Sequence, residues 1–335
     1  MEQINQLLSL SDRPTFCVED GCITAANEAA RARQIRPGDR IESILSSGAD
    51  EIAQFEGGFL GLSLNLCGQT CPATVTVLGE RQLFTLEPEE TREEFRLLSL
   101  ASQELREPLT DVMALVEGLN DDPERVAGIS RGLYRMLRMV GNLSAHPMPR
   151  MELMDVGELL RELWDKTQPA CESRGIEFAF IPHPVPVYSY VDGDLLSRAL
   201  YNLLSNAIKF SDRGSITMQL SLRRRFYQIT LLDSGSTLPD PGQDPFSRFL
   251  REPGLGDPRW GMGLGMRVVR SAALAHGGTV LMDAPPSGGV RVTLSLPLRQ
   301  EMPSLRSPRL HVSYTGEHDP MLVELSDVLP TEFYK

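Results

Sequence analysis

The sequence predicts a multidomain α+β protein, because three stretches of the 335-residue chain follow three different apolar patterns. Residues 1–88 contain strand-like alternating runs, and residues 89–146 repeat apolar positions at steps of three and four, as paired helices do. Residues 150–299 combine both patterns, which is typical of helices packed on a sheet. We expect an α/β module, a helical hairpin and an α/β sandwich, followed by a C-terminal extension at 300–335.

Composition and charge narrow the class of protein. A hydrophobic content of 41% fits a folded chain of two or three domains. The formal net charge of −12 argues against a nucleic-acid-binding surface, because phosphate contacts need clustered Lys and Arg. The one basic cluster, Arg223 to Phe226, is expected in a turn between strands. The apolar runs are too short for a membrane span and the first residues do not resemble a signal peptide, so we expect a cytoplasmic protein without a membrane span.

The N-terminal stretch has the signals of a small mixed domain. "PTFCVEDGCITAAN" contains a turn at Asp20-Gly21 between two apolar runs, which predicts a β-hairpin. "NEAARAR" predicts a short helix, and "GFLGLSLNL", "ATVTVL" and "RQLFTLE" predict further strands. This order of hairpin, helix, loop and strands resembles a PAS-type sensor module. A plain α+β domain without a ligand is the alternative.

The central stretch predicts two long antiparallel helices. The connector "NDDPE" carries stop and start signals, with Pro at the first turn of the second helix. Each apolar seam is too narrow to face a full core, so we expect the hairpin to pair with a second copy as the four-helix bundle of a homodimer. Packing on neighbouring domains is the alternative. The two apolar series are Phe95, Leu98, Ser102, Leu105, Leu109, Val112, Val116 and Leu119, then Val126, Ile129, Leu133, Met136, Val140 and Leu143.

The C-terminal stretch alternates helical and strand-like segments. "MDVGELLRELWDKTQPACESRG" and "DGDLLSRALYNLLSNAIKF" predict helices, whereas "IEFAFI", "GSITMQLSL", "RRFYQITLLD" and "GVRVTLSLP" predict strands. In the extension, "RLHVSY" and "MLVELS" are expected to form a terminal hairpin or a loosely attached segment, to which we assign no activity.

Four motifs in fixed order resemble the nucleotide-binding boxes of the histidine-kinase branch of GHKL ATPases. They are "NLLSNAIKFS" (asparagine box), "DSGSTLP" (first glycine box), "DPFSRF" (phenylalanine box) and "GMGLGM" (second glycine box). Upstream, "SQELREPL" resembles the phosphoacceptor box of sensor histidine kinases. The resemblance covers roughly residues 90–298, and it implies a two-component signalling protein that binds ATP and Mg²⁺.

The asparagine box places three polar side chains on one face of a predicted helix. Asn202 and Asn206 lie one turn apart, and Lys209 follows on the same face. Amide oxygens suit Mg²⁺, which keeps several waters and takes further ligands from nucleotide phosphates, and a Lys offers a cation to phosphate. The resemblance implies that Asn206 is the direct metal ligand and that Asn202 supports it. A polar face without a ligand is the alternative.

The first glycine box follows an apolar strand. Asp233 ends that strand, where a carboxylate can accept the exocyclic amino group of adenine, and Gly235 lets the backbone approach the base. The family pattern has a second glycine where this chain has Thr237. A threonine adopts positive φ poorly and adds bulk, so it is expected to narrow the pocket or weaken binding.

The second glycine box precedes a predicted helix. Gly261, Gly263 and Gly265 leave N–H groups and the positive end of the helix dipole free to face a polyphosphate. The Pro- and Gly-rich segment from Asp240 to Trp260 has the composition of a lid, with Phe246 among its apolar anchors.

The phosphoacceptor box departs from the family at its reactive position. Gln103 stands where the family has histidine, and the amide nitrogen lone pair of glutamine is delocalised into the carbonyl, so nucleophilicity is lost. Glu104, the base by resemblance, then has no proton to take. His146, about 10 Å further along the helix axis, is an alternative acceptor. Ser99 and Thr110 share the helical face of Gln103 but are expected to be surface residues.

Two classes of function follow from these residues. In the first, the chain binds ATP and Mg²⁺ but does not autophosphorylate at the usual site, and acts as a nucleotide-gated regulatory partner of a kinase or a response regulator. In the second, it is an active protein kinase that phosphorylates a histidine or a serine of a partner in trans, or that uses a non-standard acceptor.

Overall fold

The computed structural model describes residues 8, 11–87, 89–117, 122–143, 149–211, 214–239, 244–246, 264–299 and 318–334. For residues 89–96, 103, 107 and 117 it describes the backbone alone.

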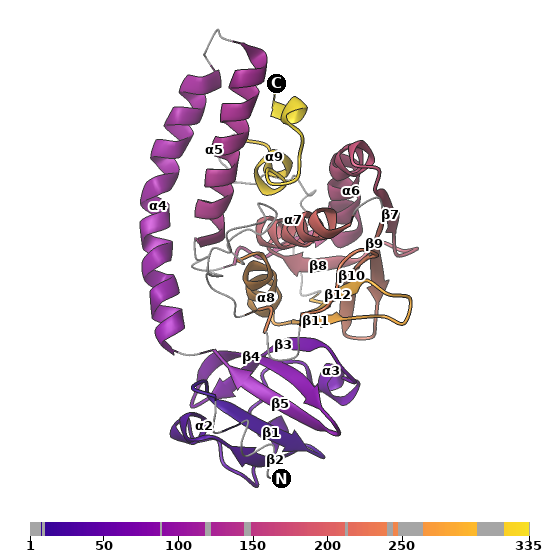
Figure 1. Ribbon diagram of the computed structural model, residues 1–335. Coiled ribbons are helices and arrows are strands. Elements are labelled where there is room, and N and C mark those ends of the chain that lie inside the picture. The colour runs from indigo at the N-terminus through magenta and orange to yellow at the C-terminus, as the bar shows by residue number, and fades with distance from the viewer. Residues whose placement is uncertain are drawn as a thin grey trace.

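The N-terminal module is a five-stranded antiparallel sheet with short helical segments inserted between its second and third strands (Figure 1). Asp20 and Gly21 have φ of 50° and 73°, as a tight hairpin turn requires, and the predicted hairpin is confirmed. Asn27 caps the predicted helix by accepting from the Ala30 amide at 2.9 Å. The elements are β1 (Thr15–Glu19), β2 (Cys22–Ala26), α2 (Glu28–Ala32), η1 (Ile41–Ser43), α3 (Ala49–Ala53), β3 (Phe59–Leu66), β4 (Gln69–Leu78) and β5 (Arg81–Leu86).

The hairpin consists of α4 (Glu89–Glu117) and α5 (Pro123–Leu143), which lie side by side (Figure 1). Pro123 is the first residue of α5, a position whose backbone N–H has no partner within the helix, so the N–H that proline lacks is not needed there. Val116, Leu133 and Val140 of the predicted seam are buried. Other large apolar side chains of the hairpin are exposed: Leu97, Leu98, Leu100, Leu105, Val112, Leu115, Ile129, Met136 and Met139.

The third region packs helices on one face of a sheet. Every helix and strand predicted for it from the sequence is confirmed, and Arg223, Arg224 and Arg225 lie exposed in the turn between two strands. The elements are β6 (Glu152–Asp155), α6 (Val156–Ser173), β7 (Glu177–Ile181), β8 (Tyr188–Val191), α7 (Gly193–Phe210), β9 (Ser215–Leu222), β10 (Phe226–Asp233), α8 (Gly265–Ala275), β11 (Thr279–Asp283) and β12 (Val290–Pro297).

One continuous sheet joins the N-terminal module to this region. Its ten strands run in the order β2-β1-β5-β4-β3-β11-β12-β10-β9-β7, and β3 pairs antiparallel with β11 (Figure 1). Glycines allow the close approach: a Cβ on Gly61 would lie 2.8 Å from Val280 Cγ1, and one on Gly58 would overlap the Met282 carbonyl oxygen. The two regions therefore share backbone hydrogen bonds and not merely side-chain contacts.

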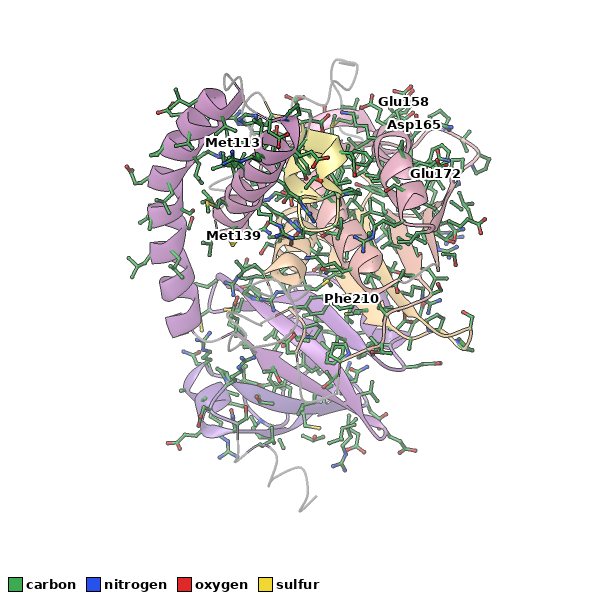
Figure 2. All side chains as sticks on the ribbon, turned by 45° about the horizontal axis from the view of Figure 1, so that its top comes forward. Met113, Met139, Glu158, Asp165, Glu172 and Phe210 are labelled. Carbon is green, nitrogen blue, oxygen red and sulfur yellow. The ribbon has the colours of Figure 1, made fainter. Side chains whose placement is uncertain are left out.

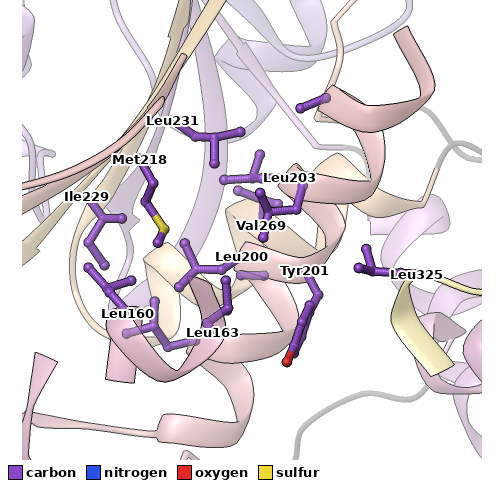
Figure 3. Close-up of a cluster of buried hydrophobic side chains, with 14 of the residues drawn as sticks. Leu160, Leu163, Leu200, Tyr201, Leu203, Met218, Ile229, Leu231, Val269 and Leu325 are labelled. Carbon is purple, nitrogen blue, oxygen red and sulfur yellow. The ribbon is translucent and has the colours of Figure 1, made fainter. Parts of the chain in front are cut away.

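The main core fills the space between α6, α7 and the sheet. Leu160, Leu200 and Met218, from α6, α7 and β9, point toward one another in Figure 3. The outer face of α6 is polar, since Glu158, Asp165 and Glu172, spaced by seven residues, are exposed (Figure 2). Apolar burial on one face thus fixes how α7, the central helix, lies on the sheet.

The C-terminal segment differs from both structures expected for it. "MLVELS" forms α9 (Pro320–Glu324) and the turn after it, followed by the 3-10 helix η3 (Thr331–Tyr334). Asp319 caps α9 and Pro320 is its first residue, so these two start signals outweigh the strand-like composition. The segment is not loosely attached, because Val323, Leu325 and Leu329 are buried in the main core. "RLHVSY" lies outside the described residues.

A search of the described helices for a membrane span found none with the required length and apolar character.

Candidate functional site

The three asparagine-box residues all lie on α7 but differ in surroundings. Asn202 is fully buried, Asn206 is half-buried, and Lys209 is buried near the C-terminal end of the helix. The helix begins after Asp192, whose Oδ1 accepts from the Leu195 amide at 2.9 Å. Only Asn206 of the two amides therefore keeps part of its surface open to a ligand.

The start of α8 lies against the asparagine face of α7. A Cβ on Gly265 would be 3.1 Å from Asn202 Oδ1 and 3.7 Å from Asn206 Nδ2. The structure thus brings the second glycine box and the asparagine box together, with the free N–H end of α8 beside both amides. Gly261 and Gly263 lie outside the described residues.

Asp233 is placed by the alternation of β10. Tyr227, Ile229 and Leu231 face the core, and Asp233 is the next inward position, so its carboxyl group is buried. Burial raises the pKa of Asp233 above its ordinary value, while hydrogen bonds from Ser236 and Gly235 oppose that rise. The Gly235 and Ser236 amides donate to Oδ1 at 3.1 and 2.6 Å.

Glycine is required at Gly235, because a Cβ there would overlap the Phe210 carbonyl oxygen and lie 2.7 Å from Ser211 Cα. Thr237 is exposed in the segment that follows β10. Gly235, next to Asp233 on that segment, thus packs against the C-terminal end of α7.

His276 has a structural part in the turn of residues 275–278 at the end of α8. Its Nδ1 donates to the Ala272 carbonyl at 2.7 Å, and its Nε2 accepts from the Asp192 amide at 3.0 Å. Burial lowers the pKa of His276, which keeps the ring neutral and in this tautomer. The ring thereby ties the end of α8 to the start of α7.

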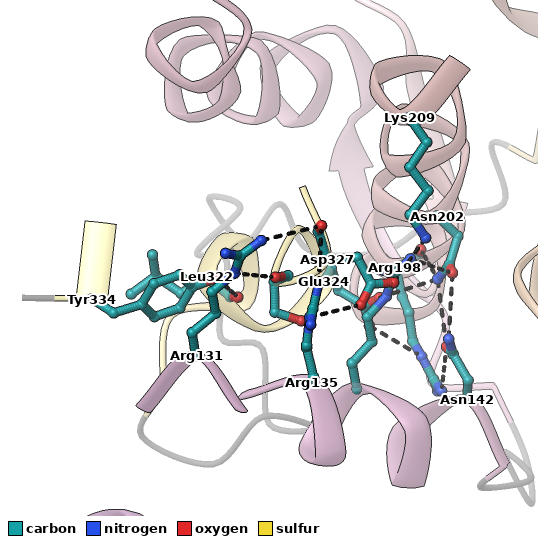
Figure 4. A network of polar contacts seen from close by, with 12 residues as sticks. Arg131, Arg135, Asn142, Arg198, Asn202, Lys209, Leu322, Glu324, Asp327 and Tyr334 are labelled. Atoms are coloured by element: carbon teal, nitrogen blue, oxygen red, sulfur yellow. Dashed lines mark hydrogen bonds and ion pairs between the residues drawn. The ribbon is translucent and has the colours of Figure 1, made fainter. Parts of the chain in front are cut away.

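Asn202 is held by the hairpin and the C-terminal segment (Figure 4). Its Nδ2 donates to Glu324 Oε2 at 3.2 Å, and its Oδ1 accepts from Arg138 Nη2 at 3.2 Å. Glu324 is itself fully buried, with its carboxylate 3.3 Å from Arg138 Nε and 3.5 Å from Arg198 Nε. Asn142 of α5 also lies within 3.5 Å of Asn202.

Lys209 is paired with the same segment. Its Nζ donates to Asp327 Oδ2 at 2.8 Å, and Arg138 Nη1 donates to that oxygen at 2.7 Å. Burial and the charge of Arg138 lower the pKa of Lys209, more than Asp327 raises it. Burial alone would raise the pKa of Asp327, but Arg138 and Lys209 outweigh it, so the pKa is lowered and the carboxylate stays charged.

The acceptor region is only partly described. Position 103 lies within α4, whereas the Gln103 side chain and His146 lie outside the described residues. Glu104 is exposed. Ser99 is buried, not on the surface as expected, and Thr110 donates to the Arg106 carbonyl at 3.0 Å. The buried side of α4 thus includes Ser99, which the predicted apolar series did not contain, as well as Ser102, which it did.

The predicted lid is described at one point, Asp244 to Phe246. Phe246 is fully buried in the main core, as its expected part as an anchor requires. Asp244 Oδ2 accepts from Thr74 Oγ1 at 2.9 Å, so the phenylalanine box contacts the N-terminal module.

Reasoning from the sequence missed Arg138, Arg198, Glu324 and Asp327, which surround the asparagine box. One signal was present: Arg131, Arg135 and Arg138 follow one another at steps of four and three, which places them on one face of α5. Together with Lys209 and the amides of α7, these residues form a set of groups that bind anions and hard cations.

Comparison with known proteins identifies the third region. Residues 191–300 match the family model described as histidine kinase-, DNA gyrase B-, and HSP90-like ATPase. We therefore call this region, which the match covers from residue 191 to residue 300, the ATPase domain.

Curated relatives extend the likeness beyond this domain. The chain is 28% identical over 217 residues to the signal transduction histidine-protein kinase BaeS of Escherichia coli, covering 60% of this chain and 46% of BaeS. It is 29% identical over 229 residues to the sensor-like histidine kinase SenX3 of Mycolicibacterium smegmatis, covering 62% of this chain and 58% of SenX3. The chain thus spans about half the length of the relatives it matches.

A solved structure shares the fold. Full-length ShkA in complex with AMPPNP superposes with a TM-score of 0.51 at 22% identity, covering 63% of this chain and 47% of ShkA. The likeness shows a shared mixed α/β fold. Residues 191–300 thus match the ATPase family, and 60 to 62% of the chain is similar to curated sensor histidine kinases.

Proposed function

We propose that the chain is a two-component signalling protein that binds ATP and Mg²⁺ in its ATPase domain without autophosphorylating at position 103. It acts in the cytoplasm as a nucleotide-gated regulatory partner of a kinase or a response regulator. The observation that carries this proposal is Gln103 in the acceptor box, together with the close approach of Asn202 and Asn206 to the start of α8.

The arrangement around α7 suits a magnesium nucleotide. Asn206 offers a half-buried amide oxygen to Mg²⁺, and the N–H groups at the start of α8 lie beside it to receive phosphate oxygens. Asp233 offers a buried carboxylate to the adenine amino group. The AMPPNP bound to ShkA supports the same use of the fold here.

The chemistry at position 103 supports a role without self-phosphorylation. Phosphoryl transfer to the usual position needs a nucleophilic nitrogen, and the nitrogen lone pair of the Gln103 amide is delocalised into its carbonyl group. Glu104 is exposed on α4, where it can contact a partner. A chain that binds ATP but lacks the acceptor cannot transfer the phosphoryl group to itself, so ATP binding would act as a signal by shifting conformations.

Dimerisation and sensing are parts of the same proposal. Among the described side chains of α4 and α5, nine large apolar ones are exposed, which supports pairing of two hairpins into a four-helix bundle, since so much exposed apolar surface is unfavourable in water. The antiparallel sheet with helices between β2 and β3 supports a PAS-like sensor module. All five cysteines are free, as is usual where thiols stay reduced.

The first test is binding. Isothermal titration of the full chain with a non-hydrolysable ATP analogue should show magnesium-dependent affinity that Asn206→Ala removes. Asn65→Ala, which deletes an exposed amide on β3, is the matched control and should bind like the parent. Equal binding with and without Mg²⁺, or by Asn206→Ala and the parent, would contradict the assigned metal site.

The second test is transfer. Incubation with γ-labelled ATP should give no acid-labile, base-stable phosphate on the chain, and Gln103→His should restore it if the catalytic parts are intact. Label on the parent would overturn the proposal, and mapping it to His146 would identify a non-standard acceptor. Transfer to a histidine-bearing partner that cannot bind ATP would instead establish a trans kinase.

A further inference from the structure

The C-terminal segment places one carboxylate between three cations. Asp327 Oδ2 lies 2.8 Å from Lys209 Nζ and 2.7 Å from Arg138 Nη1, while Oδ1 lies 3.3 Å from Arg135 Nε (Figure 4). Arg135 and Arg138 come from α5 and Lys209 from α7, so the hairpin and the ATPase domain each contribute to one anion-binding cluster. We call Arg135, Arg138 and Lys209 the cationic cluster.

Three cations contact the one carboxylate of Asp327. They are Arg135, Arg138 and Lys209, and Arg138 also pairs with Glu324. Asp327 is the more accessible of the two acids, with a side chain 27% exposed against 0% for Glu324. A phosphate at the position of Asp327 would offer these cations more charge and more acceptor oxygens than one carboxylate does.

The cluster adjoins the phosphate end of the proposed nucleotide site. Arg138 Nη2 donates to Asn202 Oδ1, and that oxygen is the atom nearest the Cβ position of Gly265 at the start of α8. One arginine thus bridges the Asp327 carboxylate and the residue packed on the second glycine box. Guanidinium and ammonium groups recognise carboxylate and phosphate by the same charge-assisted hydrogen bonds.

We propose that the cationic cluster is a subsite for the terminal phosphate of the bound nucleoside triphosphate, and that Asp327 occupies it as an internal carboxylate which the phosphate displaces. This inference rests on the proposed function. In this inference, Arg135 and Arg138 of the hairpin contact the bound nucleotide. Because the triphosphate displaces Asp327, its binding loosens the C-terminal segment from α5 and α7. A diphosphate, which lacks the displacing group, leaves the segment in place.

The test measures affinity in the full chain. With Mg²⁺ present, Asp327→Ala should bind a non-hydrolysable ATP analogue about tenfold more tightly than the parent, which corresponds to about 1.4 kcal/mol. Its affinity for ADP should change by less than about threefold. Asp327→Asn, which keeps the size of the side chain, should show the same preference, and Arg135→Gln should weaken binding of the ATP analogue alone.

Asp319→Ala is the matched control, because Asp319 lies on the same segment and caps α9 by accepting from the Met321 amide at 2.8 Å. An equal gain for Asp319→Ala would show that general loosening, not a vacated subsite, raises affinity, and would overturn the inference. Equal gains for ATP and ADP, or a gain reproduced by inorganic phosphate alone, would overturn the assignment to the terminal phosphate.

The outcome separates this inference from the proposed function. Magnesium-dependent ATP binding that is the same in the parent and in Asp327→Ala would overturn the subsite and leave the proposed function standing. Absence of ATP binding in every variant would overturn both. As a second readout, hydrogen exchange of the amides of 318–334 should accelerate on addition of the ATP analogue and not of ADP, and unchanged exchange would contradict displacement.

Discussion

The N-terminal module and the C-terminal segment both join the ATPase domain, but through different contacts. The module is joined by backbone pairing of β3 with β11, by glycines that allow close approach, and by Glu87, which is buried against Arg267 and Arg270. The segment inserts Glu324 and Asp327 among arginines and places a few apolar side chains in the core. The first junction combines strand pairing with a buried ion pair, whereas the second relies on ion pairs and a few buried apolar side chains.

The largest expected effect comes from the charge at the N-terminal junction. Glu87→Ala leaves Arg267 and Arg270 buried without their shared carboxylate, which should lower the free energy of unfolding by about 3 to 5 kcal/mol. Chemical denaturation followed by circular dichroism would measure the loss. Glu19→Ala removes an acid that pairs with Arg81 at the surface and should cost less than about 1 kcal/mol. If both variants lost a similar free energy of unfolding, burial of Glu87 between the two arginines would not strengthen this junction.

The next effect tests the close approach of backbone. Gly58 and Gly68 have φ of 87° and 80°, so alanine is strained at both, but only at Gly58 would the Cβ overlap the partner strand. Gly58→Ala should therefore cost about 1 to 3 kcal/mol more than Gly68→Ala. Denaturant titration of the two variants gives this difference directly. If the two losses were equal, tight packing of β3 on β11 would not contribute to stability.

A smaller effect concerns His276, which ties the end of α8 to the start of α7. Burial holds the pKa of His276 below 6.5, and the charge of Arg299 acts with it, against the bond to Ala272 and the charge of Asp192. The unfolded chain therefore binds this proton at a higher pH than the folded chain does. The contribution of neutral His276 to the free energy of unfolding is complete above pH 6.5 and declines as the pH falls toward the pKa of the folded state. The slope is at most about 1.4 kcal/mol per pH unit.

Protonation would also remove the acceptor that Nε2 offers to the Asp192 amide, which loosens the end of α8. The pKa of Asp327 lies below 3.8, so the C-terminal contacts keep their charge while this happens. Urea midpoints at pH 7.5 and 5 should differ less in His276→Gln than in the parent. The comparison variant is His183→Gln, which removes a half-exposed imidazole that has no part in this contact.

The smallest effect concerns one hydrogen bond of the C-terminal segment. Tyr334 Oη donates to the Leu322 carbonyl at 2.9 Å, which joins η3 to α9. Tyr334→Phe should cost about 1 kcal/mol and raise protease sensitivity of the segment. Tyr188→Phe, at an exposed position on β8, should leave both unchanged. If Tyr334→Phe changed neither stability nor protease sensitivity, apolar burial and charge would hold the segment without this bond.

Local patterns were sufficient for much of the ATPase domain. The period of α7 placed Asn202, Asn206 and Lys209 on one face, and the alternation of β10 carried Asp233 inward. Contacts between distant segments were not accessible in this way. Pairing of β3 with β11 joins residues about 220 positions apart, and no sequence pattern in either strand identifies its partner.

The C-terminal segment was missed for a different reason. Its strand-like letters "MLVEL" are short enough to suit a strand or one turn of a helix, and the Asp319-Pro320 start signal decides between them. The partners of Glu324 could not be inferred, because an acid that is fully buried looks the same in a sequence as an exposed one.

The position of Glu324 and Asp327 has a practical consequence for work on the isolated ATPase domain. The family match ends at residue 300, so a fragment cut at its boundaries loses both acids as well as Arg138 of α5. Nucleotide affinities measured on such a fragment would describe a site with Lys209 and Asn202 newly open to solvent. Enzymologists who compare the fragment with the intact chain would then be comparing two different binding sites.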